Sequence, residues 1–147
     1  MSDWTEQALS SDDIRIAIID QMEDAVVLAD RNGIIRLWNR GAEVLFGFSA
    51  EDAVGMGLDL IVPEKFLRAH EDGFKRAVAA GRLRTEGRIL TTRSKNKYGS
   101  RLYVDFTFGL LKGPAGEVLG VFAIGRDATA RHLEEVAMKV KAEQSMA

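Results

Sequence analysis

Residues 101–110 alternate between polar and apolar side chains, and this period of two constrains the fold more than any other feature of the chain. Successive side chains of a β-strand point to opposite faces of a sheet, so the pattern predicts a strand with one buried face. An antiparallel sheet is indicated, because helical crossovers usually cover both faces of a parallel one. The side chains expected to face the core are Leu102, Val104, Phe106, Phe108 and Leu110.

Turn signals place further strands beside this one. Residues 30–33 contain Asn-Gly between the apolar runs 25–29 and 34–38. That dipeptide favours a tight hairpin, because both of its residues tolerate a positive φ. A Gly/Pro turn at 112–116 precedes another apolar strand at 118–124. We therefore expect several of the strands to be joined as hairpins.

Helical patterns separate and flank these strands. Ser10 or Ser11 is a favourable cap for a first helix, and shorter helical pieces begin near Asn39. A longer amphipathic helix is predicted from about Pro63 to Ala80, and a polar helix follows Asp127. The order of one helix, two strands, several helices, three strands and a last helix predicts an α+β domain.

Composition excludes several classes of protein. The 147 residues suffice for one ordinary domain, and a net charge of −2 gives no reason to expect binding to nucleic acid. The absence of cysteine excludes disulfides and thiolate chemistry. No apolar run approaches the roughly 20 residues of a membrane span. Residues 1–13 are too acidic and polar for a secretory signal, so we expect a cytoplasmic protein without a membrane anchor.

Two longer motifs resemble the PAS family of sensory domains. The stretch IIRLWNRGAEVLFGFSAEDAVG at 34–55 is similar to the PAS signature, in which an Asn opens a short helix before Phe-Gly-aromatic-Ser-x-Glu. The stretch GEVLGVFAIGRDATARHLEE at 116–135 is similar to the last PAS strand and its Asp-x-Thr exit into a signalling helix. The resemblance implies a five-stranded antiparallel sheet with helices covering one face and a pocket for a small ligand or cofactor.

The same resemblance divides the chain into three parts. Residues 1–20 are expected to form an N-terminal flanking helix, 21–129 the PAS domain, and 130–147 a C-terminal signalling helix. PAS domains commonly dimerise through such flanking helices. The apolar stripe Leu133, Val136 and Val140 fits this role, because a helix with an exposed apolar stripe needs a partner surface.

One of only two histidines in the chain lies within the amphipathic helix. Helical spacing places His70 on the same face as Phe66, Gly73 and Phe74, which is the face expected to point towards the sheet. A neutral imidazole in an apolar pocket is a competent axial ligand for haem iron, and Gly73 leaves room for a flat molecule. A histidine at the pocket rim, hydrogen-bonded to backbone or water, is the simpler interpretation of the residue alone.

The surrounding sequence adds a second resemblance. The stretch at 68–89 is similar to the corresponding helix and strand of the haem-binding PAS oxygen sensors, which implies haem b with His70 as its metal ligand. In the histidine-kinase type, the next strand supplies an arginine on the opposite side of the haem, and Arg88 occupies the comparable position here. The phosphodiesterase type uses a methionine there, and none lies between Met56 and Met138. Phe106 and Phe108 would form the apolar wall.

Each of these residues has a structural alternative. Arg88 fits equally well as a solvated strand residue, and Phe106 and Phe108 as ordinary core. The basic cluster Arg93, Lys95 and Lys97 favours an exposed charged hairpin, with an anionic group of a ligand as the other interpretation.

Two functions follow, and neither is enzymatic, because no nucleophile–base pair, phosphate loop or set of metal ligands is apparent. The first is a stand-alone PAS sensor that binds a small ligand, with haem b sensing O2 or another diatomic gas. The second is a haem-free interaction module that dimerises or docks to a separate kinase or regulator, with a metabolite or flavin in the pocket. Both versions predict a homodimer and a signalling partner in trans.

Overall fold

The computed structural model describes residues 9–146 and contains a five-stranded antiparallel sheet in the order β2-β1-β5-β4-β3. The sheet predicted from the alternating pattern is therefore confirmed. Three hairpins join neighbouring strands, and β1 and β5 pair along the centre of the sheet although they lie far apart in the sequence. The strands are β1 (Ala25–Asp30), β2 (Ile35–Trp38), β3 (Leu90–Lys95), β4 (Arg101–Lys112) and β5 (Val118–Asp127).

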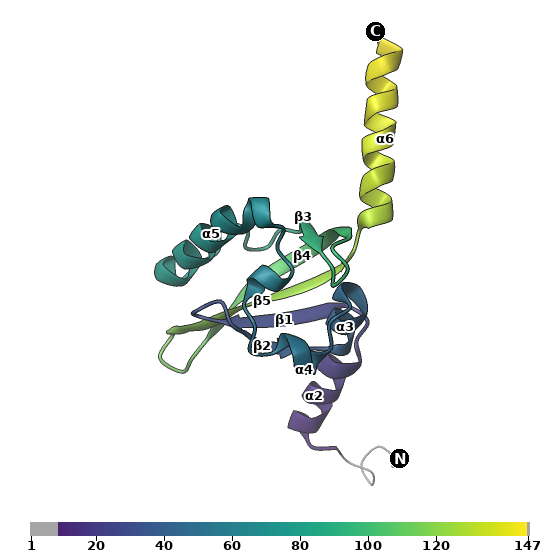
Figure 1. Cartoon of the computed structure of the whole chain (residues 1–147). Coiled ribbons are helices and arrows are strands. Elements are labelled where there is room, and N and C mark those ends of the chain that lie inside the picture. The colour runs from purple at the N-terminus through teal and green to yellow at the C-terminus, as the bar shows by residue number, and fades with distance from the viewer. Residues whose placement is uncertain (1–8, 147) are drawn as a thin grey trace.

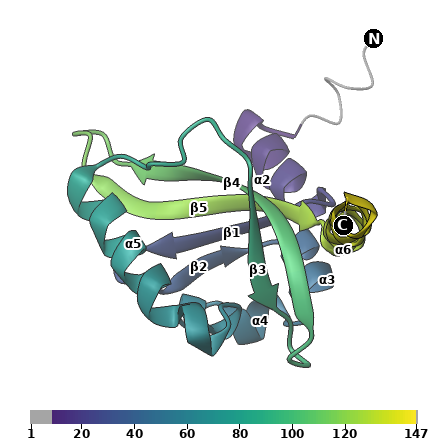
Figure 2. The same cartoon turned by 90° about the horizontal axis from the view of Figure 1, so that it is seen from above.

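Helices cover the inner face of this sheet and flank it at both ends (Figures 1 and 2). The helix α6 extends away from the rest of the domain, as Figure 1 shows. In the part of the chain described, no helix combines the length and the apolar character needed to cross a bilayer. The helices are α2 (Ser11–Gln21), α3 (Arg40–Phe46), α4 (Ala50–Ala53), α5 (Leu67–Ala80) and α6 (Thr129–Met146), with short 3₁₀ turns η1 (Leu58–Leu60) and η2 (Glu64–Phe66).

Asn39 connects the helical layer to the sheet. Its side chain is almost fully buried, and its Oδ1 accepts hydrogen bonds from the backbone N–H groups of Val26 (2.8 Å) and Ala42 (2.9 Å). Its Nδ2 donates to the carbonyl oxygens of Ile19 (2.8 Å) and Asp24 (2.9 Å). One buried amide with all of these partners fixes α2, β1 and α3 relative to one another, because leaving any partner unpaired inside the core would be costly.

The hydrophobic core lies between α3, α4, η1 and the inner face of the sheet. Phe46 and Ile35 are completely buried, and the Trp38 and Phe46 rings contact each other with centroids 5.3 Å apart. Val104 and Phe106 continue this core onto β4, as the alternating pattern predicts. Towards α5 the core thins out, because none of the α5 side chains is fully buried.

Two predicted boundaries were wrong, for local reasons. The helix predicted from Pro63 begins as the 3₁₀ turn η2, and the α-helical part starts only at Leu67. The strand on which Arg88 was expected begins only at Leu90, because Gly87 has φ +76° and the Arg88 N–H bonds back to the Thr85 carbonyl (3.0 Å). Residues 85–88 are therefore a turn, and Arg88 lies in the loop before β3 instead of within a strand.

Candidate functional site

A cavity of about 1050 Å³ lies between α5 and the inner face of the sheet. Its volume is at the upper end of the range of roughly 300–1,000 Å³ that is usual for small-molecule pockets. The walls come from α5, from the loop after it, from η1, and from residues of β1, β3, β4 and β5. The helix α5 makes few contacts with the sheet, so the space between them is left open.

Five of the predicted binding residues line this cavity. Phe106 and Phe108 form its wall on β4, and their rings lie with centroids 5.3 Å apart. The Phe106 ring lies so close to Gly125 on β5 that a Cβ atom at Gly125 would come within 2.5 Å of it. His70, Gly73 and Phe74 line the cavity from α5. The helix α5 and the strand β4 thus bring together predicted binding residues that are more than thirty positions apart in the sequence.

Among the residues that line this mostly apolar cavity, His70 has the side chain suited to bind a metal. Its side chain is half-buried on the cavity wall, and its ring centroid lies 6.4 Å from that of Phe74. Burial lowers the pKa of the His70 imidazole below its usual range, while the neighbouring Glu71 carboxylate opposes this in part. This shift favours the neutral form of His70, which is the form in which an imidazole nitrogen binds a metal.

Gly73 lies one turn beyond His70 and keeps the cavity open. A Cβ atom placed there would meet only the Arg76 Nη2, at 3.8 Å, so a larger side chain would occupy the cavity instead of a packed interface. A glycine in the middle of a helix normally lowers its stability relative to alanine. Space for a ligand is a physical reason for its presence at this position.

Arg88 does not line the cavity. It is exposed, and its guanidinium Nη2 donates a hydrogen bond to the backbone carbonyl of Arg84 (2.8 Å). Four other arginines do line the cavity, namely Arg76, Arg82, Arg84 and Arg93. Sequence spacing could have found Arg76, which follows Gly73 by nearly one helical turn. Arg82 and Arg84, in the loop after α5, could not be predicted as lining residues. An irregular segment has no periodicity that indicates where its side chains point.

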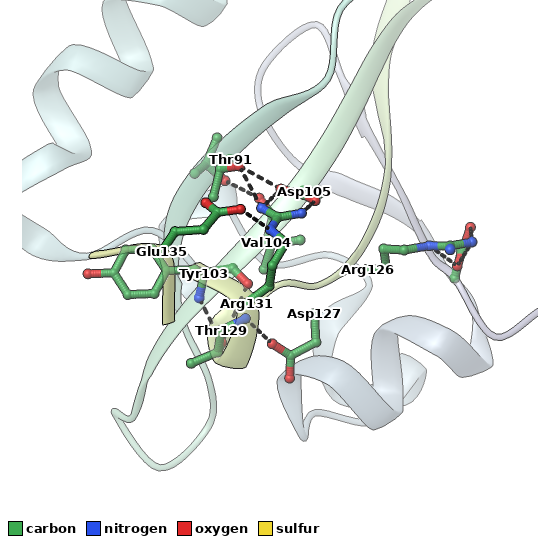
Figure 3. A network of polar contacts seen from close by, with 11 residues as sticks. Thr91, Tyr103, Val104, Asp105, Arg126, Asp127, Thr129, Arg131 and Glu135 are labelled. Carbon is green, nitrogen blue, oxygen red and sulfur yellow. Dashed lines mark hydrogen bonds and ion pairs between the residues drawn. The ribbon is translucent and has the colours of Figure 1, made fainter. Parts of the chain in front are cut away.

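The opposite face of the same strands carries a polar network that reaches α6 (Figure 3). The Arg131 guanidinium on α6 binds both carboxylate oxygens of Asp105 on β4 and donates to the Thr91 hydroxyl oxygen (3.2 Å) on β3. Thr91 in turn donates to Asp105 Oδ1 (2.6 Å), and Arg131 Nε pairs with Glu135 one helical turn further on (3.2 Å). Arg131 and the Thr91 hydroxyl hold the pKa of the Asp105 carboxyl at about 2.

Backbone contacts complete the junction between the sheet and α6. The Tyr103 N–H donates to the Thr129 hydroxyl oxygen (3.0 Å), and the Ala128 N–H donates to the Tyr103 carbonyl (2.8 Å). The Asp127 carboxylate accepts from the Thr129 N–H (2.8 Å) and so caps the start of the helix. The His132 ring stacks on Tyr103 with centroids 4.0 Å apart, so the second histidine belongs to this junction and not to the cavity.

Comparison with known protein families gives a single assignment. The family described as PAS fold matches residues 15–128, which is most of the chain. The protein belongs to the PAS family. Its sheet order, inner-face helices and cavity are those of a PAS sensory domain, and the fold expected from the sequence is confirmed.

Individual PAS relatives support this assignment. The oxygen sensor protein DosP of Escherichia coli is 26% identical over 125 residues, which cover 85% of this chain and 15% of DosP. The sensor protein FixL of Bradyrhizobium diazoefficiens is 33% identical over 60 residues, 41% of this chain and 12% of FixL. The crystal structure of a PAS domain from Colwellia psychrerythraea superimposes with a TM-score of 0.70 at 25% identity, covering 80% of this chain and 96% of that one. The chain therefore spans only a small part of DosP and FixL.

Proposed function

We propose that this PAS domain is a sensor that binds haem b in the cavity beneath α5, where His70 would hold the iron, and that it responds to O2 or another diatomic gas. The observation that carries the proposal is a half-buried imidazole on the wall of a large, mostly apolar cavity. The similarity of residues 68–89 to the haem-binding PAS oxygen sensors supports it, as does the relationship to a protein named as an oxygen sensor.

The lining residues fit such a group. His70 offers one nitrogen ligand, Gly73 leaves the space beside it open, and Phe74, Phe106 and Phe108 exclude water from a flat apolar ring system. Haem, when bound, would supply the iron at which a diatomic gas binds. The role of Arg88 as a hydrogen-bond donor to that gas stays a prediction. For this role the Arg88 side chain would have to break its hydrogen bond with the Arg84 carbonyl and enter the cavity.

A route from the cavity to α6 follows from the alternation along β4. Phe106 and Phe108 point into the cavity, while Asp105 between Val104 and Phe106 points to the other face and binds Arg131. A shift of β4 caused by a change in the cavity would therefore move the carboxylate that anchors α6. We propose this as the path by which the state of the ligand reaches the signalling helix.

We further propose that α6 transmits this signal as a homodimer and that a separate kinase or regulator reads it. Leu133, Val136 and Val140 are each about half exposed and lie on one stripe of a helix that projects from the domain. An apolar stripe of this kind is covered most simply by the same stripe of a second copy. Dimerisation or docking without haem is the alternative function, and the α6 stripe supports it equally.

Titration of purified protein with hemin, followed by absorbance, tests the haem proposal. Bound haem gives a Soret band that differs from that of free hemin, and His70→Ala should weaken or abolish it. His132→Ala is the matched control, because it removes the other histidine of the chain at a site outside the cavity. A protein that takes up no hemin, or a Soret band unchanged by His70→Ala, would contradict the proposal and leave the haem-free module.

A further inference from the structure

The charge distribution around the cavity indicates the chemical class of its ligand. The residues that line it include four arginines and one histidine, yet no aspartate or glutamate within the described residues. The chain as a whole has 22 acidic against 20 basic residues, so this segregation is not a consequence of composition. The rest of the lining is mostly apolar, which weakens screening by water and makes an unpaired positive charge more costly there.

Arg93 differs from the other three arginines in its burial. Its Nε is completely buried and has no hydrogen-bond partner within the described residues. Its guanidinium carbon lies 5.8 Å from the centroid of the Phe66 ring, and the Phe66 ring also has the Lys65 ammonium 5.0 Å from its centroid. Buried donors of this kind are nearly always paired, so an unpaired one beside a cavity points to an acceptor that the chain itself does not provide.

Neighbouring basic residues do not share this feature. Lys95 and Lys97 belong to the same basic cluster in the sequence, but neither lines the cavity. Arg88 does not line the cavity either, and its guanidinium bonds to the Arg84 backbone carbonyl. Arg93 is thus the member of the cluster with a buried, unpaired donor, and the planar donors of its guanidinium match a carboxylate, sulfonate or phosphate better than an ammonium would.

We infer that the cavity takes an amphipathic anion, with its apolar body against Phe106 and Phe108 and its acidic group bound by Arg93. The arginines of α5 and of the following loop add positive charge around the cavity, which strengthens the preference for an anion. The inference rests on the proposed function only in placing the ligand in this cavity. It holds for haem and equally for any flat or elongated apolar acid.

Two fluorescent probes with the same apolar body separate charge from hydrophobicity. Anilinonaphthalene sulfonate is an anion, and phenylnaphthylamine is the same ring system without the sulfonate. We expect the sulfonate probe to bind at least about tenfold more tightly to the full chain, because its acidic group gains charge-assisted hydrogen bonds. Gly73→Leu should weaken both probes and thereby place them in the cavity.

Variants of Arg93 decide the inference. Arg93→Gln should weaken the sulfonate probe by about fivefold or more and change the uncharged probe less than about twofold. Arg93→Lys should keep part of the preference, and Arg40→Gln, which removes an exposed arginine outside the cavity, should change neither affinity. Equal affinities for the two probes, no binding of the sulfonate probe, or an equal loss of both in Arg93→Gln would overturn it. The preference should persist in His70→Ala, so failure to bind hemin would not be confused with failure of this inference.

Discussion

Arg131, near the start of α6, binds both carboxylate oxygens of Asp105 on β4, and the two residues lie 26 positions apart. The Asp105 side chain is only 16% exposed, whereas that of Arg131 is 48% exposed. The contact joins a strand that forms the cavity wall to a helix that has few other contacts with the domain. Together with the stack of His132 on Tyr103, it is one of the side-chain links that hold α6 to the sheet.

Removing this link should loosen α6 while leaving the sheet folded. In Arg131→Gln the Asp105 carboxylate keeps only its bond from Thr91, so hydrogen exchange of amides in the first turns of α6 should speed up several-fold. Amides of β1 and β5 should exchange as before. Arg126→Gln is the matched control, because Arg126 makes a similar two-bond contact (3.1 and 3.0 Å) with Asp24, which precedes β1, instead of with a residue of α6. Equal exchange in α6 in both variants would contradict a coupling role for Arg131.

The Asp105–Arg131 pair should also make stability depend on acid. The pKa of Asp105 lies at about 2 in the folded state against about 3.8 in the unfolded chain, so its contribution is fully present above the unfolded value. That contribution is lost as the pH falls from about 4 towards about 2, because the unfolded state binds the proton first. Urea unfolding at pH 7 and at pH 3 measures the loss. The loss should be smaller in Asp105→Asn, and an equal loss in both proteins would exclude Asp105 as its source.

His70 should also make the protein less stable as the pH falls, but for a different physical reason. Burial lowers the pKa of His70 in the folded state. Above the ordinary value of about 6.5 the imidazole is neutral in both states, so its burial there carries no cost of removing a proton. As the pH falls through that value, the unfolded chain takes up a proton more readily and stability decreases. His70→Gln should remove this part of the pH dependence between about pH 7 and about pH 5. An identical profile for His70→Gln and the unaltered protein, measured by thermal unfolding, would show that the imidazole is not shielded from water.

Two substitutions at Gly73 should separate the effect of this glycine on helix stability from its effect on ligand binding. Gly73→Ala adds one methyl group to open space, so it should stabilise the fold by about 0.5–1 kcal/mol through better helix propensity. Gly73→Leu extends into the cavity and should lower the affinity for hemin by at least about tenfold while the protein stays folded. Thermal unfolding and hemin titration measure the two effects. Destabilisation by alanine would show that Gly73 is packed against a neighbour after all.

Local patterns account for most of the fold. The period of two in β4 placed Val104 and Phe106 in the core, and Asn-Gly placed the first hairpin, because both patterns follow from backbone geometry alone. The helix spacing that grouped His70 with Gly73 also placed them together on the cavity wall. These features could be predicted because each depends on residues within one or two turns of the chain.

Features that depend on irregular backbone or on distant contacts could not be predicted in this way. Arg88 was assigned to a strand, but the positive φ of Gly87 turns the chain just before it. Nothing within the α6 sequence indicates that Arg131 will meet Asp105, since the contact exists only after β4 and β5 have paired. Arg93 was grouped with two lysines by composition, and only the packing of Phe66 against β3 distinguishes it.

The exposed stripe of α6 leads to the last prediction. Val136→Glu and Val140→Glu together place two carboxylates on the stripe, so they should convert a dimer into a monomer, because charges buried between two helices are not compensated. Ala142→Glu is the control, since helical geometry puts Ala142 on the opposite side of the helix. Sedimentation of all three proteins at equal concentration measures the result. If the double variant sediments as the unaltered protein does, α6 is not the dimer interface, and its stripe must be covered by a different protein.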